Sequence, residues 1–207
     1  MNKRYSRLRN IFLPKFPIRR ANFIDLLINR SSYRKFSGKP IKLQQLSEIL
    51  YYSAGLVGES EGKFHLPYPS AGGKYPIEIY PLVLCEGELK IGLYHYSPVE
   101  HALDILLTPL KKEDTSSIWM SQKWFRKASV ILVLTAMYHK TTDKYGHKGL
   151  PFPFIEAGHI GQNVYLLAQS LGIGCCAIGQ FKEKELCRLL DINPLEEYPI
   201  YYIALGN

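Results

Sequence analysis

The sequence has 207 residues, of which 46% are hydrophobic, and a formal net charge of +8. This size supports one buried core, and 21% charged with 13% aromatic residues excludes a disordered chain. No apolar run approaches the roughly 20 residues of a membrane span, and no secretory signal is recognisable. The four cysteines form no CxxC pair or disulfide framework, so we expect a reducing, cytoplasmic location.

Basic residues crowd the N-terminus, at Lys3, Arg4, Arg7, Arg9, Lys15, Arg19 and Arg20. Such a run can contact nucleic acid, an anionic membrane or an acidic partner. No nucleic-acid-binding module follows it, so we favour a solvated or partner-draped arm over residues 1–20. Residues 21–207 are then expected to form a single domain.

The first half of the chain opens with two predicted helices. Apolar residues recur at helical spacing over residues 21–29 and again over 43–54, where Gly55 is a typical helix stop. A loop rich in glycine and proline follows over residues 58–76. Turn residues at this density indicate a long irregular connection.

The middle of the chain predicts strands. Residues 77–85 and 89–96 are typical of a hairpin, and Pro81 argues for an edge position or a bulge in the first strand. Residues 111–123 are expected to be helical. The continuous apolar run over 129–137 indicates a central strand covered on both faces.

The C-terminal third contains the strongest helix prediction. Over residues 154–170 the apolar positions fall three and four apart. A short strand over 173–178, an amphipathic helix over 181–191 and a last strand over 199–205 follow. Because helices and strands mix without regular βαβ alternation, the fold class is expected to be α+β.

Three polar clusters are candidate ligand contacts: residues 30–34 (RSSYR), 69–76 (PSAGGKYP) and 156–163 (EAGHIGQN). The paired guanidiniums of the first can bind a phosphate, although salt bridging at a helix end is equally compatible with the spacing. The glycines of the second let the backbone approach a flat ligand, and they match neither a P-loop nor GxGxxG.

In the third cluster, His159 lacks partners at metal-ligand spacing, so a helix-packing or polar-network role is favoured. Gly158 and Gly161 leave room there for a helix or a ring. Cys175 and Cys176 are interpreted as packing residues, because neighbours on a strand point to opposite faces.

Taken in order, the motifs RSSxR, PSAGGxYPxE, GxYxY, KYG, EAGHxGQNxxLxAxxLGxG and IGxF closely resemble the nitroreductase superfamily. More narrowly, the chain is similar to its SagB-type, or azoline dehydrogenase, branch over residues 26–206. The resemblance implies a nitroreductase-like α+β fold with a mostly antiparallel sheet flanked by helices. It also implies an intertwined homodimer with one FMN in each of two interface sites.

The resemblance implies FMN contacts in four groups. The phosphate and ribityl chain would contact Arg30, Ser31, Ser32 and Arg34. The isoalloxazine ring would lie against Pro69, Ser70, Ala71 and Gly73, and its N5 edge would lie near Ile178 and Gly179. The central helix would contribute Gln162 and Asn163. Family members often carry a Lys or Arg beyond the last strand, whereas this sequence stops at Gly206–Asn207. The phosphate charge is therefore expected to rest mainly on Arg30 and Arg34.

Two Lys-Tyr pairs occur, Lys74–Tyr75 in the glycine-rich loop and Lys144–Tyr145 shortly before the long helix. From composition alone, Lys144 and Tyr145 are ordinary residues of an exposed, flexible loop. The azoline dehydrogenases carry their catalytic pair at this place, so the resemblance makes Lys144 and Tyr145 the catalytic candidates. In a desolvated pocket, a lysine and a tyrosine can accept the proton that an azoline ring loses.

The expected function is therefore FMN-dependent oxidation of thiazoline or oxazoline rings to thiazole or oxazole in peptide natural-product biosynthesis. A cyclodehydratase partner and a peptide substrate would accompany it. Two alternatives remain open: an NAD(P)H-dependent nitroreductase or quinone reductase, and a non-catalytic family member that binds flavin or a partner.

Overall fold

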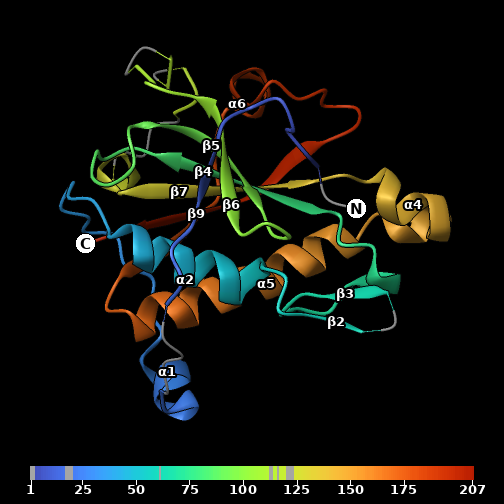
Figure 1. Ribbon diagram of the computed structural model, residues 1–207, viewed down its shortest axis with the longest axis horizontal. Coiled ribbons are helices and arrows are strands. Elements are labelled where there is room, and N and C mark those ends of the chain that lie inside the picture. Colours follow the sequence, from blue (N-terminus) through green and yellow to red (C-terminus); the bar gives the residue numbers. More distant parts are fainter. Residues whose placement is uncertain (1–2, 17–20, 61, 112–113, 116, 120–123) are drawn as a thin grey trace.

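The computed structural model describes residues 3–16, 21–60, 62–111, 114–115, 117–119 and 124–207. A seven-stranded sheet with the order β1-β6-β5-β4-β7-β9-β8 lies at its centre, and all neighbouring strands are antiparallel (Figure 1). Its strands are β1 (Asn10–Phe12), β4 (Ile77–Val83), β5 (Gly92–Ser97), β6 (Ala102–Leu107), β7 (Val130–Ala136), β8 (Gly174–Ile178) and β9 (Tyr198–Gly206).

Helices cover the two faces of this sheet unequally. The helices α2 (Leu43–Ala54) and α5 (Phe152–Ser170) lie on one face, and α6 (Glu183–Leu190) lies on the other (Figure 1). Each buries an apolar stripe against the strands, with Ile49 and Leu50 of α2 fully buried. The sheet thus has a hydrophobic core on each side.

The smaller elements lie around this core. They are the helices α1 (Phe23–Asn29) and α4 (His139–Tyr145), the 3-10 turns η1 (Ala71–Gly73), η2 (Trp124–Lys127) and η3 (Gly146–Gly149), and a two-stranded sheet of β2 (Gly58–Ser60) and β3 (Lys63–His65). Within the described ranges, no helix is long and apolar enough to cross a membrane.

Most predicted elements are confirmed. The apolar run at 129–137 forms β7, which lies between β4 and β9 and is buried along its whole length. The predicted helix at 154–170 is α5, and the helix at 43–54 is α2. Residues 112–113, 116 and 120–123 of the predicted helix at 111–123 lie outside the described residues, so that element stays a prediction.

Of the two alternatives predicted for Pro81, an edge position or a bulge, the edge position is wrong. The strand β4 lies inside the sheet, where Pro81 is opposite Leu132 of β7. The pairing of β4 with β5 begins one residue later, at Leu82. A shortened ladder on one side is how an internal strand accommodates a residue without an N–H group.

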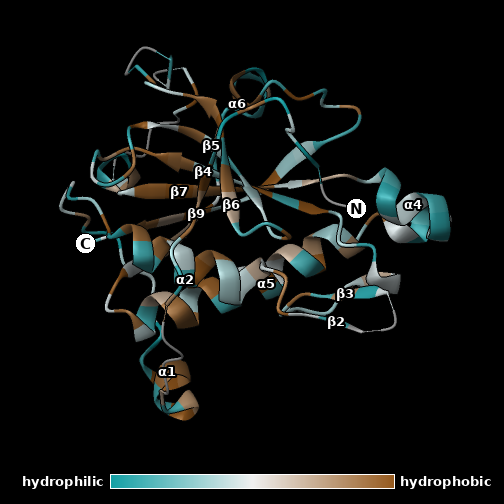
Figure 2. Ribbon diagram, viewed as in Figure 1, coloured by the Kyte–Doolittle hydropathy of each residue, from teal (hydrophilic) through white to brown (hydrophobic). Residues whose placement is uncertain are grey.

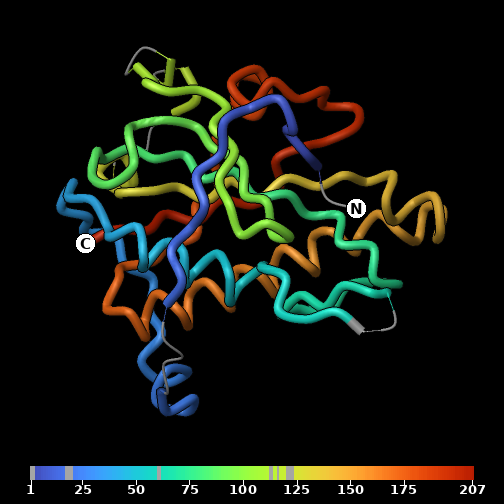
Figure 3. Tube along the Cα trace, in the orientation of Figure 1, coloured from blue at the N-terminus to red at the C-terminus, as the bar shows by residue number. Residues whose placement is uncertain are grey.

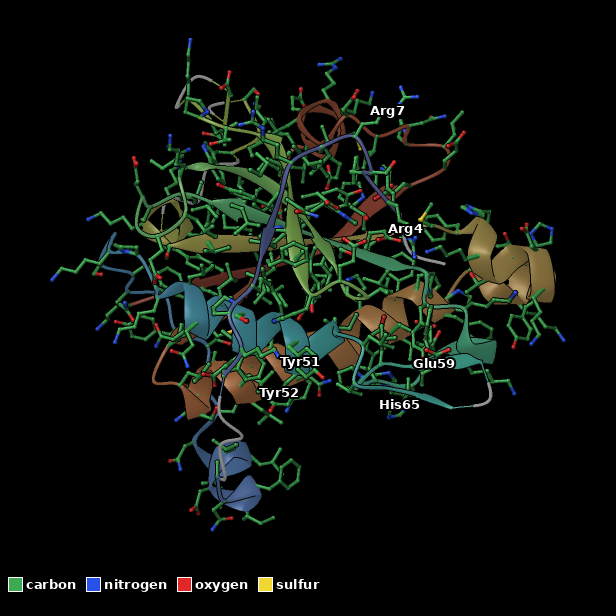
Figure 4. All side chains as sticks on the ribbon, viewed as in Figure 1. Arg4, Arg7, Tyr51, Tyr52, Glu59 and His65 are labelled. Atoms are coloured by element: carbon green, nitrogen blue, oxygen red, sulfur yellow. The ribbon has the colours of Figure 1, made fainter. Side chains whose placement is uncertain are left out.

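The expected solvated arm is instead partly built into the sheet. Residues Asn10–Phe12 pair with β6, and Figure 3 shows this dark blue segment running along the sheet. Neither β1 nor β6 was predicted from the sequence, and the three residues of β1 are too few to show a period. Arg4 and Arg7 are exposed (Figure 4), whereas Arg19 and Arg20 lie outside the described residues.

The helix α1 has no buried residue in the single chain. Phe23, Ile24, Leu27 and Ile28 are 59%, 57%, 41% and 74% exposed. Figure 2 shows this apolar helix standing away from the body of the molecule. Such an apolar surface is typical of a face that another chain covers.

Candidate active site

The glycine-rich loop is held in an unusual backbone conformation. Gly72, Gly73 and Tyr75 have φ angles of 61°, 65° and 45°. Glycine adopts this left-handed region without steric cost, which explains the two adjacent glycines. Ser70 stabilises the turn, because its Oγ accepts a 2.8 Å hydrogen bond from the backbone N–H of Tyr75.

Glu156 of α5 anchors this loop through hydrogen bonds. Its Oε1 accepts hydrogen bonds from Ser70 Oγ at 2.9 Å and from the Ala71 N–H at 3.1 Å. Glu156 is only 2% exposed, and its Oε2 has no hydrogen-bond partner among the described residues. Sequence reasoning did not single out this carboxylate; the available signal was its place in the apolar stripe of α5, three residues after Pro153 and four before Ile160.

Burial raises the pKa of Glu156 to about 7, despite the opposing hydrogen bonds from Ser70 and Ala71 and the positive charge of Lys140. The folded protein therefore binds a proton at this site that the unfolded chain releases near pH 4.5, and folding stability falls as the pH rises from about 4.5 to about 7. We expect Glu156→Gln to flatten this part of the stability profile, as measured by urea denaturation between pH 5 and 8. Glu59→Gln, at an exposed position, is the control, and an unchanged slope in Glu156→Gln would contradict the assignment.

Lys144 and Tyr145 lie against the same loop at Gly72. A Cβ atom added at Gly72 would come within 2.5 Å of Tyr145 Oη and 2.7 Å of Lys144 Nζ. The lysine ammonium is 5.3 Å from the centre of the Tyr145 ring. The structure therefore brings this predicted pair into direct contact with the predicted ring-binding loop.

The pair is helical and not part of a flexible loop. Both residues belong to the last turn of α4, which is capped by Gly146 with a φ of 58°. The Tyr145 ring packs at 5.2 Å against the ring of Phe152 at the start of α5. Tyr145 is half-buried, whereas Lys144 is exposed in the single chain.

The second Lys-Tyr pair has a different role. The Tyr75 ring packs edge-on against Tyr68 at 5.6 Å, and its hydroxyl donates to the Phe64 carbonyl at 3.2 Å. These contacts join the loop to the β2–β3 hairpin. Lys74 is exposed.

A cavity of about 420 Å³ lies between the hairpin and the loop. Its lining includes Gly72, Gly73 and Tyr75 from the loop and Phe64 and Leu66 from the hairpin side. Glu59 and His65 are exposed on the same hairpin (Figure 4). A molecule in this cavity would lie next to the loop that contacts Lys144 and Tyr145.

The predicted phosphate contacts gather at the other end of α5. The Arg30 guanidinium lies 5.3 Å from the Tyr165 ring, and Ser32 Oγ is 3.2 Å from Tyr165 Oη. The Ala177 N–H donates to the same hydroxyl at 2.7 Å, which brings the end of β8 next to this group. Ser31 lines an adjoining cavity of about 440 Å³.

The further predicted FMN contacts Arg34, Ile178, Gly179 and Asn163 lie in different surroundings. The Arg34 guanidinium lies 5.8 Å from the Trp124 ring. Ile178 is buried in the core, whereas a Cβ atom at Gly179 would meet no atom within 4 Å. Asn163 donates a 2.9 Å hydrogen bond to the Pro67 carbonyl, which ties the segment just before the PSAGG residues to α5.

Gln162 and His159 are exposed on α5. Gly161 is close-packed, because a Cβ atom there would lie 2.5 Å from the Tyr201 ring, whereas Gly158 faces open space. Cys175 and Cys176 are both buried, as expected for packing residues. In the described part of the chain, no group of three or more His, Cys, Asp or Glu residues is arranged to hold a metal ion.

The two predicted ligand clusters are separated within one chain. Glu156, below the loop, and Tyr165, beside Arg30, are nine positions apart on α5. At about 1.5 Å per residue this corresponds to roughly 13 Å along the helix. Within one chain, the predicted ring-binding loop thus lies with the Lys144–Tyr145 pair. Arg30, Ser31 and Ser32 form a second group at a different place on α5.

Several solved structures share this fold. A structure from Ralstonia eutropha described as a nitroreductase superposes with a TM-score of 0.77 at 27% identity, covering 96% of this chain and 89% of that one. The Escherichia coli microcin synthetase McbBCD complex, with truncated pro-MccB17 bound, gives a TM-score of 0.74 at 21% identity, covering 95% and 77%. A Desulfovibrio desulfuricans structure in complex with FMN gives 0.60 at 14% identity, covering 91% and 87%.

The model of the nitroreductase family matches residues 27–207, and the chain belongs to this family. It is 35% identical over 183 residues to a Methanocaldococcus jannaschii protein named as a nitroreductase, MJ1384, covering 88% of this chain and 89% of that protein. It is 30% identical over 155 residues to the microcin B17-processing protein McbC of Escherichia coli, covering 70% of this chain. The chain spans 56% of the length of McbC in that match.

Proposed function

We propose that this protein is an FMN-dependent dehydrogenase that oxidises thiazoline or oxazoline rings in a peptide to thiazoles or oxazoles. The contact of Lys144 and Tyr145 with Gly72 carries this proposal, because it places two proton-handling groups at the loop predicted to border the flavin. The similarity to McbC, a processing protein of a peptide microcin, supports the substrate class. A cyclodehydratase partner is part of the same proposal, in line with McbBCD being a synthetase complex with truncated pro-MccB17 bound.

The residues present fit an FMN. Gly73 and Gly179 each leave the space beside Cα open, so a flat ring could approach the backbone at both places. Arg30, Ser31 and Ser32 supply a cation and two hydroxyls next to a cavity of about 440 Å³, which suits a phosphate. When bound, FMN supplies two-electron redox chemistry by accepting a hydride from the substrate.

Two copies of the chain would complete this site. The loop cluster and the Arg30 cluster lie at different ends of α5, and the apolar face of α1 is exposed in the single chain. Pairing of two chains would bury this face and could bring the loop of one chain to the Arg30 cluster of the other. We therefore propose a homodimer with two flavin sites at its interface.

Aromatisation removes a hydride from one ring carbon and a proton from its neighbour. The hydride is the part that flavin accepts, so the protein must supply a base for the proton. Tyr145 Oη and Lys144 Nζ both lie at Gly72 and are the groups of this chain placed for that task. The peptide would enter through the cavity of about 420 Å³ beside the hairpin.

The direct test uses purified protein reconstituted with FMN and a synthetic peptide that contains one thiazoline. We expect the peptide to lose two hydrogens, seen by mass spectrometry, while the flavin absorbance bleaches without oxygen. A protein that binds FMN and leaves every azoline peptide unchanged would refute the proposal.

The similarity to the protein named as a nitroreductase favours a second candidate, an NAD(P)H-dependent nitroreductase or quinone reductase. The same preparation separates the two functions. Rapid bleaching of the flavin absorbance by NADPH, followed by reoxidation of the flavin with a nitroarene or a quinone, would support the reductase.

A further inference from the structure

A cluster of buried charges lies behind the candidate active site, and the proposed function does not use it. At its centre is Glu78 of β4, which is 1% exposed. Glu78 Oε2 lies 3.0 Å from His95 Nε2, and His95 Nδ1 lies 3.1 Å from Asp104 Oδ2. Both ring nitrogens thus face carboxylates, an arrangement that a doubly protonated imidazolium satisfies.

The second oxygen of Glu78 connects this cluster to α4. Lys140 Nζ donates to Glu78 Oε1 at 3.0 Å and to the backbone carbonyl of Tyr75 at 3.2 Å. One ammonium therefore joins three parts of the molecule: the buried strand β4, the glycine-rich loop and the helix α4. Lys140 precedes Lys144 by four positions, which is about one helical turn.

The N-terminal segment closes the cluster. The Lys3 backbone N–H donates to Glu78 Oε1 at 3.1 Å, and Lys3 Nζ forms a 3.0 Å ion pair with Glu197. The Tyr5 ring packs edge-on against His95 at 5.0 Å. Three carboxylates, of Glu78, Asp104 and Glu197, are thus balanced by His95, Lys3 and Lys140.

This arrangement holds the loop and α4 at one shared group. Buried charge-assisted hydrogen bonds are strong and directional, so Lys140 has little freedom to move. Tyr75, whose carbonyl it holds, has a φ of 45°, a left-handed conformation that a tyrosine rarely adopts unless neighbours impose it. The strained loop residue and α4 are therefore linked by the same ammonium group.

We propose that Lys140, anchored by buried Glu78, is a positioning residue that holds Lys144 and Tyr145 against the glycine-rich loop. The inference rests on the proposed function for its catalytic meaning. The mechanical coupling between α4 and the loop is independent of the reaction. Lys140 does not touch Lys144 or Tyr145 in any described contact and acts through the helix and the loop.

The test compares Lys140→Met and Lys140→Arg in the FMN-loaded protein. Lys148→Met is the matched control, because Lys148 is exposed just after α4. Amide hydrogen exchange is followed by mass spectrometry in two peptides, over residues 139–146 and 70–76. With Lys140→Met we expect exchange to accelerate about tenfold or more in both peptides together, since one strong hydrogen-bonded charge is lost from both.

With the azoline peptide, Lys140→Met should lower kcat about tenfold and leave KM nearly unchanged, since the substrate cavity is intact. Lys140→Arg should restore both the exchange pattern and kcat, and Lys148→Met should alter neither. Lys140→Gln, which keeps a donor for the Tyr75 carbonyl, replaces the methionine variant if that one does not fold.

Faster exchange in α4 alone, with the loop unchanged, would overturn the inference. So would wild-type kcat in Lys140→Met, or a failure of Lys140→Arg to restore the coupling. The exchange experiment needs no turnover, so an enzyme that oxidises no azoline would refute the proposed function and leave the positioning role to be decided by exchange.

Discussion

Lys144→Ala and Tyr145→Phe should each slow azoline oxidation by about a hundredfold or more while FMN remains bound, because a positioned acid–base group typically contributes that much. Both side chains end at Gly72, whereas neither touches Arg30, Ser31 or Ser32 in any described contact. Turnover of a thiazoline peptide and titration of FMN by its absorbance measure the two effects separately.

Lys148→Ala is the control for this pair, since Lys148 is an exposed lysine of the following turn η3. It should oxidise the peptide at the wild-type rate. If Lys144→Ala and Tyr145→Phe both matched that rate, neither side chain would be the base and the catalytic assignment would be refuted. Loss of FMN from either variant would point instead to a role in shaping the cofactor site.

Glu78→Ala should lower the free energy of unfolding by about 3–5 kcal/mol, because it leaves His95 and Lys140 without their shared buried counter-charge. Removing one partner of a buried ionic cluster is more harmful than removing the whole cluster. Urea denaturation at pH 6 measures the effect. Glu59→Ala, on the exposed hairpin, should change stability by less than about 0.5 kcal/mol.

The pH dependence of the free energy of unfolding is a second test of the cluster around Glu78. Burial would raise the pKa of Glu78, but the hydrogen bond from His95 and the charge of Lys140 outweigh it and lower that pKa below 4.5. Its stabilisation is therefore complete above pH 4.5 and is lost as the pH falls through the lowered value.

His95 behaves in the opposite sense. Burial would lower its pKa, but the hydrogen bonds to Asp104 and Glu78 outweigh it and raise that pKa above 6.5. Its stabilisation is complete below pH 6.5 and is lost as the pH rises through the raised value. In Glu78→Ala, the loss of stability below pH 4.5 and above pH 6.5 should become shallower. Unchanged slopes would contradict the role of the cluster.

Several parts of the site could be predicted from the sequence because they depend on local backbone chemistry. The glycines of the 69–76 loop were interpreted as giving a backbone that a ligand can approach, and Gly72 and Gly73 adopt positive φ. The position of Lys144–Tyr145 before the long helix made it the catalytic candidate, and the structure brings it to the loop. Its role in catalysis remains a prediction.

Other features depend on contacts between residues that are distant in the sequence. The place of Glu156 in the apolar stripe of α5 indicates burial, but it does not reveal that a loop 85 positions away will supply the hydrogen bonds. The cluster of Glu78, His95 and Asp104 joins three strands, and nothing in the spacing of these residues marks them as neighbours. Long-range pairing of this kind depends on sheet order, which a single sequence does not display.

The sequence by itself determined the α+β class, the central apolar strand β7, the helices α2 and α5, and the motifs by which the nitroreductase fold could be expected. These features depend on the period of apolar residues and on glycine, which act over a few neighbouring positions. Only the tertiary structure decided that the N-terminal segment joins the sheet, that Pro81 lies in an internal strand, and that Lys140 of α4 contacts both buried Glu78 and the Tyr75 carbonyl of the loop. Each of these depends on strand pairing and on buried charges that must find counter-charges across the whole chain, which is a property of the packed molecule and not of any segment.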